Sequence, residues 1–271
     1  MRGRRHQRPA ERPTGATDLW TVIASVLVVA AFVVMPFDPT IQTWAHSVGG
    51  GTVAIFRVIT NSGNAQWFLV PSGFVTVWLA SVAMGLGGGQ AARPAAWLSG
   101  AFAFVFTAVA TSGILVNIVK VAVGRARPRM LERDGFYGFD PLGLDSDFRS
   151  FPSGHANTAF AFALAVGLLV PPLRLPLAIW AVLVAASRVV VGAHWPADVF
   201  AGAAVAVVTT IWIARGFAAR GWVFRMDGAG RLRPTPAGRL IQMRCRRALR
   251  RAAGAAVPRP VLSRAARSSS S

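Results

Sequence analysis

The stretch AAWLSGAFAFVFTAVATSGILVNIV at residues 95–119 decides the fold class, because it contains no charged side chain. A helix needs roughly 20 apolar residues to cross the ~30 Å hydrocarbon core of a bilayer, and this stretch is long enough. Five more apolar runs occupy residues 19–37, 66–86, 156–173, 175–191 and 199–214. Lipid offers no partner to unpaired backbone groups, and barrel strands would alternate apolar and polar residues, so we expect helices. The sequence therefore predicts an all-α fold, a bundle of six transmembrane helices.

The composition is also typical of a membrane protein. Hydrophobic residues make up 54% of the chain, against roughly 45–50% in soluble domains. The formal net charge of +19 would suit a nucleic-acid binder, but the arginines gather in residues 1–12 and after Ala214. That distribution indicates membrane topology, and we expect no nucleic-acid partner. The single cysteine, Cys245, excludes an intrachain disulfide and a multi-cysteine metal site.

These patterns divide the chain into three parts. Residues 1–17 form a basic N-terminal segment, residues 18–214 the six-span domain, and residues 215–271 an arginine-rich tail that ends in a serine run. Low hydrophobicity and like charge predict that much of this tail is disordered. The first apolar run resembles a signal peptide, but no small-x-small cleavage site follows it, so we expect an uncleaved first span.

The arginine distribution also predicts the orientation in the membrane. Basic residues near both ends place both termini in the cytoplasm, which requires an even number of spans. The segments at residues 38–65, 120–155 and 192–198 then face outward. The 120–155 segment breaks the charge rule, because arginines and Lys120 are interleaved there with acidic residues. It is either a solvated loop of nearly balanced charge or an anion site.

Three clusters of polar residues lie at the predicted outer ends of the last four spans. They are Lys120 with Arg127-Pro128, then Pro152-Ser153-Gly154-His155, and finally Ser187-Arg188 with His194 and Asp198. The orientation was inferred from charge alone, so the shared side of these clusters supports it independently.

The first two clusters suit a phosphate. Lys120 is the only lysine of the chain, and its ammonium adds a compact charge to the planar, bidentate guanidinium of Arg127. The alternative is a lysine that only marks the end of the third span by extending to the interface. At the start of the fourth span, Ser153 can cap the helix, Gly154 permits close approach, and His155 lies where a helix N-terminus attracts anions.

The third cluster pairs a histidine with a carboxylate. His194 and Asp198 stand four residues apart around Pro196, a residue favoured in the first turn of a helix, so both side chains can share one helical face. The carboxylate can then bind one imidazole nitrogen and leave the other free to attack or to accept a proton. Arg188, near the end of the fifth span, needs a partner for its charge. The alternative for His194 is an interfacial histidine without chemistry.

Two other chemistries do not fit the residues present. The glycine-rich run at residues 85–89 lacks the Gly-Lys-Ser/Thr that follows in a nucleotide P-loop. Two histidines and one carboxylate among cationic side chains make a poor site for a divalent ion. We therefore expect no metal and no cofactor.

The motifs Lys120-x6-Arg127-Pro128, Pro152-Ser153-Gly154-His155 and Ser187-Arg188-x5-His194-x3-Asp198 resemble the signature motifs of the type 2 phosphatidic acid phosphatase family, whose site is similar to that of vanadium haloperoxidases. The resemblance covers roughly residues 53–214, and all signature positions match. It implies a helical bundle and a metal-independent enzyme that hydrolyses a phosphomonoester or diphosphate through a phosphohistidine.

The resemblance also implies roles for the site residues. His194 corresponds to the nucleophile, Asp198 to the residue that orients it, and His155 to the acid that protonates the leaving oxygen. The phosphate cradle corresponds to Lys120, Arg127, Ser153, Gly154 and Arg188.

These observations predict a lipid phosphate phosphatase that is an integral protein of the bacterial plasma membrane. We expect its site on the extracytoplasmic side, where an acyl or prenyl chain can stay in lipid while the headgroup reaches the loops. The alternatives are a six-span transporter or scaffold that binds an anion without turnover, and a haloperoxidase. Undecaprenyl diphosphate, phosphatidic acid, phosphatidylglycerophosphate and a lipid A phosphate remain as substrates, and the oligomeric state is open.

Overall fold

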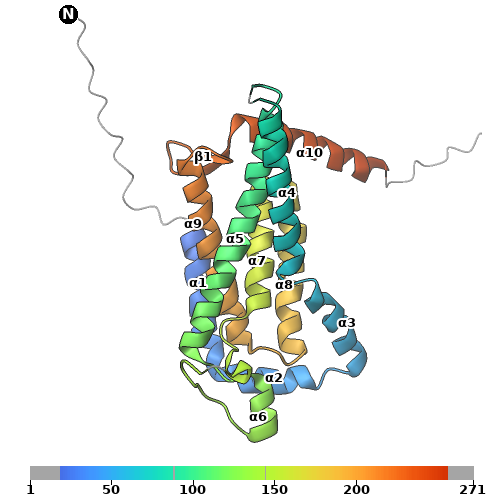
Figure 1. The fold of residues 1–271 in the computed structure, drawn as a ribbon. Coiled ribbons are helices and arrows are strands. Elements are labelled where there is room, and N and C mark those ends of the chain that lie inside the picture. Colours follow the sequence, from blue (N-terminus) through green and yellow to red (C-terminus); the bar gives the residue numbers. More distant parts are fainter. Residues whose placement is uncertain (1–18, 88, 144, 256–271) are drawn as a thin grey trace, which may run out of the picture.

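The computed structural model describes residues 19–87, 89–143 and 145–255, and most of these residues are helical (Figure 1). The predicted basic N-terminal segment and the last part of the tail, residues 256–271, lie outside the described residues. The long helices of the bundle are α1 (Leu19–Val34), α4 (Gln66–Gly85), α5 (Arg93–Val123), α7 (Gly154–Leu169), α8 (Arg174–Val190) and α9 (Pro196–Ala219). They run side by side, which confirms the predicted all-α bundle.

The remaining elements cover the two ends of this bundle (Figure 1). The lower end in that view carries α2 (Asp38–His46), α3 (Gly50–Asn61) and α6 (Pro128–Asp134), with the 3₁₀ turns η1 (Met35–Phe37) and η2 (Ser146–Phe148). The upper end carries the turn η3 (Pro171–Leu173), the antiparallel strands β1 (Phe224–Met226) and β2 (Leu232–Pro234), and α10 (Pro236–Ala255). The predicted outward loops at residues 38–65 and 120–155 therefore contain short helices.

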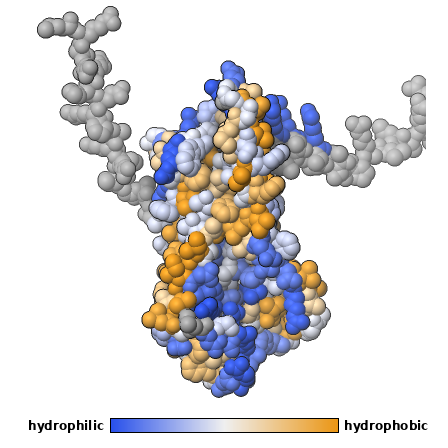
Figure 2. All heavy atoms as spheres, in the orientation of Figure 1, coloured by the Kyte–Doolittle hydropathy of each residue, from blue (hydrophilic) through white to orange (hydrophobic). Residues whose placement is uncertain are grey.

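The surface of the bundle suits lipid. Large apolar side chains on three of its helices face outward, with Phe32 68%, Phe74 71% and Trp212 67% exposed. Figure 2 shows apolar residues along the bundle and hydrophilic ones gathered towards its ends. An apolar area of this extent marks contact with a membrane rather than with water.

The described helices long enough to span a bilayer are fewer than the six predicted spans. Among the described residues, five helical segments are long and apolar enough to cross a bilayer: Leu19–His46, Gly50–Gly85, Arg93–Val123, Pro171–Val190 and Pro196–Ala219. The sixth apolar helix, α7, has only 16 residues. Because a full crossing needs roughly 20 helical residues, the count of six spans stays a prediction.

The short helix α7 lies inside the bundle, in contact with α5, α8 and α9. Its buried residues are mostly alanines, as are those of the first half of α9. Small residues let helix backbones approach closely, which favours association within a membrane. A Cβ at Gly202 of α9 would lie 2.4 Å from the main-chain oxygen of Ser153. Any larger residue there would push α9 away from the start of α7.

The ends of these helices follow local signals. α5 stops at Gly124, which has a φ of 58° and tolerates it because glycine has no Cβ. The hydroxyl of Ser153 accepts the N–H of Ala156 at 3.5 Å and caps α7, as predicted. Pro196 occupies the first turn of α9, where its missing N–H is not needed. The polar residues around these positions are thereby held at helix ends.

The chain after Ala214 differs from the expected, mostly disordered tail. α9 continues for another turn, and the hairpin and α10 follow it. Phe224 of β1 is buried against Phe104, with ring centroids 5.0 Å apart. The indole N–H of Trp97 donates to the hydroxyl of Thr235 at 3.1 Å. Composition predicts disorder because arginines dominate this segment, whereas its few apolar residues dock on the bundle.

Replacing Phe224 with alanine should release the hairpin and α10 from the bundle, because deleting a buried aromatic ring costs about 3–5 kcal/mol. We expect trypsin to cut this variant at Arg231 and Arg233 about tenfold faster than the wild type, since cleavage tracks local opening. Fragments of detergent-solubilised protein would be followed over time. Met226→Ala, on the same strand with a side chain 41% exposed, is the control. Equal cleavage of the two variants would contradict the docking of Phe224.

Candidate active site

All eight predicted site residues lie at the end of the bundle that carries α2 and α6. Each sits at or beside a helix end: Lys120 in the last turn of α5, Arg127 before α6, Ser153, Gly154 and His155 at the start of α7, Arg188 in the last turn of α8, His194 before α9, and Asp198 in its first turn. One geometric expectation is wrong. His194 does not share a helical face with Asp198, because α9 starts only at Pro196.

Asp198 is the most highly connected of these residues, and it is fully buried. Its Oδ1 accepts a hydrogen bond from Nη1 of Arg125 at 2.7 Å. Its Oδ2 accepts from the hydroxyl of Ser150 and from the main-chain N–H of Trp195 at 3.0 Å. Its main-chain oxygen accepts the N–H of Ser153 at 2.9 Å. Asp198 therefore joins the start of α9 to the segment after α5 and to the start of α7.

His194 lies against this carboxylate and is 3% exposed. Its Nδ1 is 3.5 Å from Oδ2 of Asp198, which is longer than an ordinary hydrogen bond. Its main-chain N–H donates to the oxygen of Arg188 at 3.1 Å, which fixes the turn between α8 and α9. Nε2 makes no hydrogen bond to the residues that the structure describes. With Nδ1 turned towards Asp198, Nε2 is the nitrogen left for chemistry.

The electrostatic surroundings keep His194 uncharged. Burial lowers the pKa of His194 to about 3; the charges of Lys120 and Arg188 act in the same direction, and Asp198 opposes them. Since the pKa lies far below 7, the imidazole is neutral at neutral pH and its lone pair is available. A neutral imidazole is the form that can act as a nucleophile.

Cationic side chains surround this histidine. Nζ of Lys120 donates to the main-chain oxygen of Arg149 at 2.8 Å, and Nη2 of Arg127 donates to the same oxygen at 3.4 Å. Nη1 of Arg188 donates to the hydroxyl of Thr60 at 2.7 Å. Among the described residues, the buried Nε atoms of Arg149 and Arg188 have no hydrogen-bond partner. Crowded cations with unused donors fit an anion with several oxygens.

The start of α7 completes this arrangement. A Cβ at Gly154 would lie 3.8 Å from Cε of Lys120, so the two residues adjoin. His155 is near enough to Arg188, Lys120 and Arg127 for their charges to act on its ring. The Ser153 hydroxyl accepts the N–H of Ala156, which leaves its own proton free for another acceptor. The predicted site residues are thus brought together around one space.

Several residues that the sequence did not single out support the site. Arg125 is 1% exposed, and its Nη2 donates to Asp38 at 2.6 Å and to the hydroxyl of Tyr137 at 2.6 Å. Asp38 in turn accepts the N–H of Ala197 at 3.0 Å. Arg149 adds a cation beside Lys120. The only sequence signal for Arg125 was its membership of an arginine-rich outward segment.

The described part of the chain holds no group of three His, Cys, Asp or Glu side chains that could bind a metal ion. His194 and Asp198 are close together, but the remaining neighbours are cations, which repel a divalent ion. Independence from metal stays a prediction that chemistry must test.

Comparisons with known proteins found a matching family model and related proteins. A model of the PAP2 superfamily matches residues 101–222, which contain all three motifs. A lipid A 1-phosphatase of Rhizobium johnstonii is 34% identical over 174 residues, 64% of this chain and 71% of the relative. A lipid A 1-phosphatase of Rhizobium etli is 40% identical over 128 residues, 47% of this chain and 55% of the relative.

A solved structure shares the fold. The transmembrane PAP2 type phosphatidylglycerolphosphate phosphatase of Bacillus subtilis superimposes with a TM-score of 0.51 at 21% identity, over 74% of this chain and 94% of that chain. At this identity the likeness concerns the helical bundle alone.

Replacing Arg125 with alanine should destabilise the protein, because Asp38 and Asp198 would stay buried without their cation. Breaking one side of a buried ion pair costs about 3–5 kcal/mol, which corresponds to a melting temperature lower by about 10 °C in a domain of this size. Thermal unfolding of the detergent-purified protein measures the change. The control is Arg129→Ala in the same segment, whose side chain is 54% exposed. An unchanged melting temperature for Arg125→Ala would contradict the role of this pair.

Proposed function

Because the chain belongs to the PAP2 superfamily and is a membrane phosphatase of lipid phosphates, we propose that it removes the 1-phosphate of lipid A through a phosphohistidine at His194, on the extracytoplasmic side of the membrane. The observation that carries the mechanism is the pairing of a neutral, buried His194 with Asp198 beside a cluster of cations. The two lipid A 1-phosphatases among the relatives support this choice of lipid.

The reaction proceeds in two balanced steps. Nε2 of His194 attacks phosphorus while the bond to the lipid oxygen breaks, and His155 gives its proton to that oxygen. Burial, with the charges of Arg188, Lys120 and Arg127, lowers the pKa of His155 to about 4, so the negative charge of the bound phosphate has to raise this pKa before His155 can act as the acid. Water then attacks the phosphorus of the phosphohistidine, passes a proton to His155, and breaks the phosphorus–nitrogen bond. Phosphate leaves, and both histidines return to their starting states. Splitting a difficult transfer into two easier displacements is the advantage of covalent catalysis.

The cationic side chains stabilise the transferring group. Lys120, Arg127 and Arg188 bind the equatorial oxygens, where charge is spread in the transition state. The hydroxyl of Ser153 and the main chain at Gly154 add donors at the N-terminus of α7, which itself favours an anion. Asp198 keeps the His194 ring oriented, and Arg125 keeps Asp198 in place. Arg125 is a positioning residue, because its guanidinium is occupied by carboxylates.

An apolar cavity beside the site supports a lipid substrate. It has a volume of about 270 Å³ and lies between α1, α5 and α9, with Phe32, Leu115 and Val208 in its lining. Pro152, which immediately precedes Ser153, also lines it. An acyl chain in this cavity would remain in the hydrocarbon while its headgroup reaches the cations.

The distribution of arginines supports the proposed orientation. Arg93, Arg174 and Arg220 lie at helix ends on the side of the bundle opposite His194. Short loops rich in arginine stay in the cytoplasm. This assignment leaves the catalytic end outside and the hairpin with α10 inside.

We expect the detergent-purified protein to release phosphate faster from lipid A than from phosphatidic acid, phosphatidylglycerophosphate or undecaprenyl diphosphate. The expected ratio of rates is about ten or higher, which differences in transition-state binding can provide. Brief reaction with phosphate-labelled lipid A, followed by an alkaline quench, should trap label on the protein. His194→Ala should trap none and be inactive, and EDTA should have no effect. His155→Ala should lose activity by about 10²- to 10⁴-fold, as expected for a missing general acid.

The matched control is His46→Ala, because His46 lies at the same end of the bundle in an exposed ion pair with Glu132. It should retain activity. Activity in His194→Ala, or activity lost in EDTA and restored by magnesium, would overturn the mechanism in favour of metal-assisted hydrolysis. A faster reaction with another lipid of the panel would overturn the substrate and leave the mechanism intact.

Reporter fusions test the orientation separately. Alkaline phosphatase, which is active only outside the cytoplasm, should be active when inserted near Leu142 and inactive when fused at Arg220. The opposite result would place the catalytic end in the cytoplasm. Inactivity of both fusions, with both proteins present in the membrane, would also contradict the proposed outer loop.

A further inference from the structure

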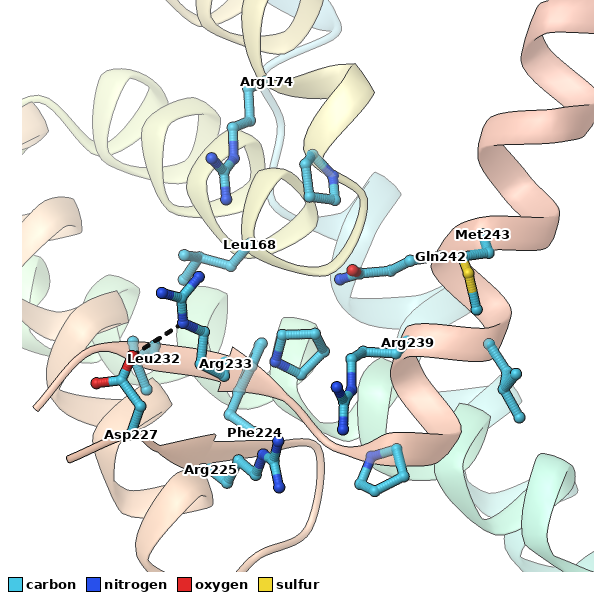
Figure 3. Close-up of a pocket in the computed structure, with 14 residues that line it drawn as sticks. Leu168, Arg174, Phe224, Arg225, Asp227, Leu232, Arg233, Arg239, Gln242 and Met243 are labelled. Carbon is cyan, nitrogen blue, oxygen red and sulfur yellow. Dashed lines mark hydrogen bonds and ion pairs between the residues drawn. The ribbon is translucent and has the colours of Figure 1, made fainter. Parts of the chain in front are cut away.

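A large cavity lies at the end of the bundle opposite the proposed catalytic residues. It is enclosed by the turn between α7 and α8, the β1–β2 hairpin and the first turns of α10 (Figure 3). Its volume is about 1010 Å³. None of the residues in the proposed mechanism lines it, so it needs an explanation of its own.

The cavity is strongly basic. Four arginines line it, Arg174, Arg225, Arg233 and Arg239, against the single acid Asp227. The carboxylate of Asp227 is already engaged: Oδ2 accepts from Nε of Arg233 at 3.0 Å, and Oδ1 accepts two main-chain N–H groups of the hairpin. The negative charge of Asp227 therefore offsets the positive charge of Arg233, and the positive charges of the other three arginines remain.

Two of these guanidinium groups are free. The side chains of Arg225 and Arg239 make no hydrogen bond or ion pair with the residues that the structure describes, and both residues are exposed and line the cavity. In Figure 3 both side chains extend into the space between the hairpin and α10. Arg174 uses only Nε, which donates to the oxygen of Gly167 at 2.9 Å. Its two terminal nitrogens are left for a ligand.

The walls of the cavity are held in place independently of any ligand. Gln242 of α10 donates to the main-chain oxygen of Leu169 at 2.8 Å, which ties α10 to the end of α7. Phe224 anchors the hairpin in the apolar core. Contacts of Gln242 and Phe224 thus help to hold the like charges of this cavity near one another. A bound anion would relieve their repulsion.

Apolar residues beside these cations indicate what kind of anion fits. Leu240 and Met243 line the cavity and are 59% and 49% exposed. The described arginines of α10 that lie further along, Arg244, Arg247 and Arg251, are exposed as well. A helix with exposed leucine or methionine and many arginines is typical of one that lies in a membrane interface. The cavity opens where two apolar helices, α7 and α8, reach the membrane surface.

We propose that this cavity binds the phosphate headgroup of an anionic phospholipid in the leaflet at the non-catalytic end of the bundle, with Arg225, Arg239 and Arg174 as its ligands. Guanidinium groups match phosphate oxygens in a bidentate manner. Basic cavities beside transmembrane helices are suited to such headgroups. The acyl chains pass along Leu240 and Met243 into the bilayer.

Native mass spectrometry of the full chain tests this site. Phosphatidylglycerol would be titrated into detergent-purified protein, and the bound fraction measured for the wild type and for Arg225→Gln/Arg239→Gln. We expect the affinity of the double variant for phosphatidylglycerol to fall by about tenfold or by a larger factor, because two phosphate contacts are removed. Both residues are exposed, so its melting temperature and its phosphatase activity in detergent should stay at the wild-type level.

The matched control is Arg244→Gln/Arg247→Gln, which removes the same charge from α10 outside the cavity. It should bind phosphatidylglycerol as the wild type does. Equal losses in the two double variants, or full binding by Arg225→Gln/Arg239→Gln, would overturn the proposal. A second arm uses glycerol phosphate: displacement of the lipid at equal concentration would show a site for soluble phosphates and overturn the lipid assignment.

Discussion

A buried carboxylate and a buried guanidinium hold the proposed catalytic end together. Asp198 and Arg125 are 0% and 1% exposed and lie 2.7 Å apart. Charges in such surroundings persist only when each is paired and its remaining donors and acceptors are satisfied. Arg125 also binds Asp38, while Asp198 also binds Ser150 and the N–H of Trp195. The pair therefore connects α2, the segment after α5 and the start of α9, and other contacts of the site depend on these positions.

Lys120 and Arg127 of the proposed cradle are positioned by a segment that this pair holds in place. Lys120 and Arg127 both donate to the main-chain oxygen of Arg149. The next residue, Ser150, donates to Asp198. The positive charges of Lys120 and Arg127 are thus placed by backbone oxygens, and their own hydrogen-bond partners are not carboxylates. A site built in this way keeps a net positive field, which favours a doubly charged headgroup over a neutral one.

The sequence predicted what depends on local patterns. Apolar runs predicted the long helices, because a bilayer-spanning helix needs little beyond length and the absence of charge. The spacing of Lys120, His155 and His194 predicted which residues would meet, since helix ends on one side of a membrane share a plane. The pairing of Arg125 with Asp38 was not predicted, because the two residues are 87 positions apart and nothing local links them. The docking of the hairpin depends on single aromatic residues such as Phe224. One such residue hardly changes the composition of an arginine-rich segment, so composition does not reveal it.

The contact between α1 and α9 has a consequence for biosynthesis. These are the first and the last of the long helices, and they pack along each other. A ribosome delivers the chain from its N-terminus, so Asp38 and Arg125 enter the membrane before Asp198 exists. Until α9 is inserted, Arg125 can pair with Asp38 but not with Asp198. During this time α1 also lacks α9, the helix against which it packs. The proposed catalytic centre therefore cannot form until α9 is present, and a chain interrupted before α9 cannot assemble it.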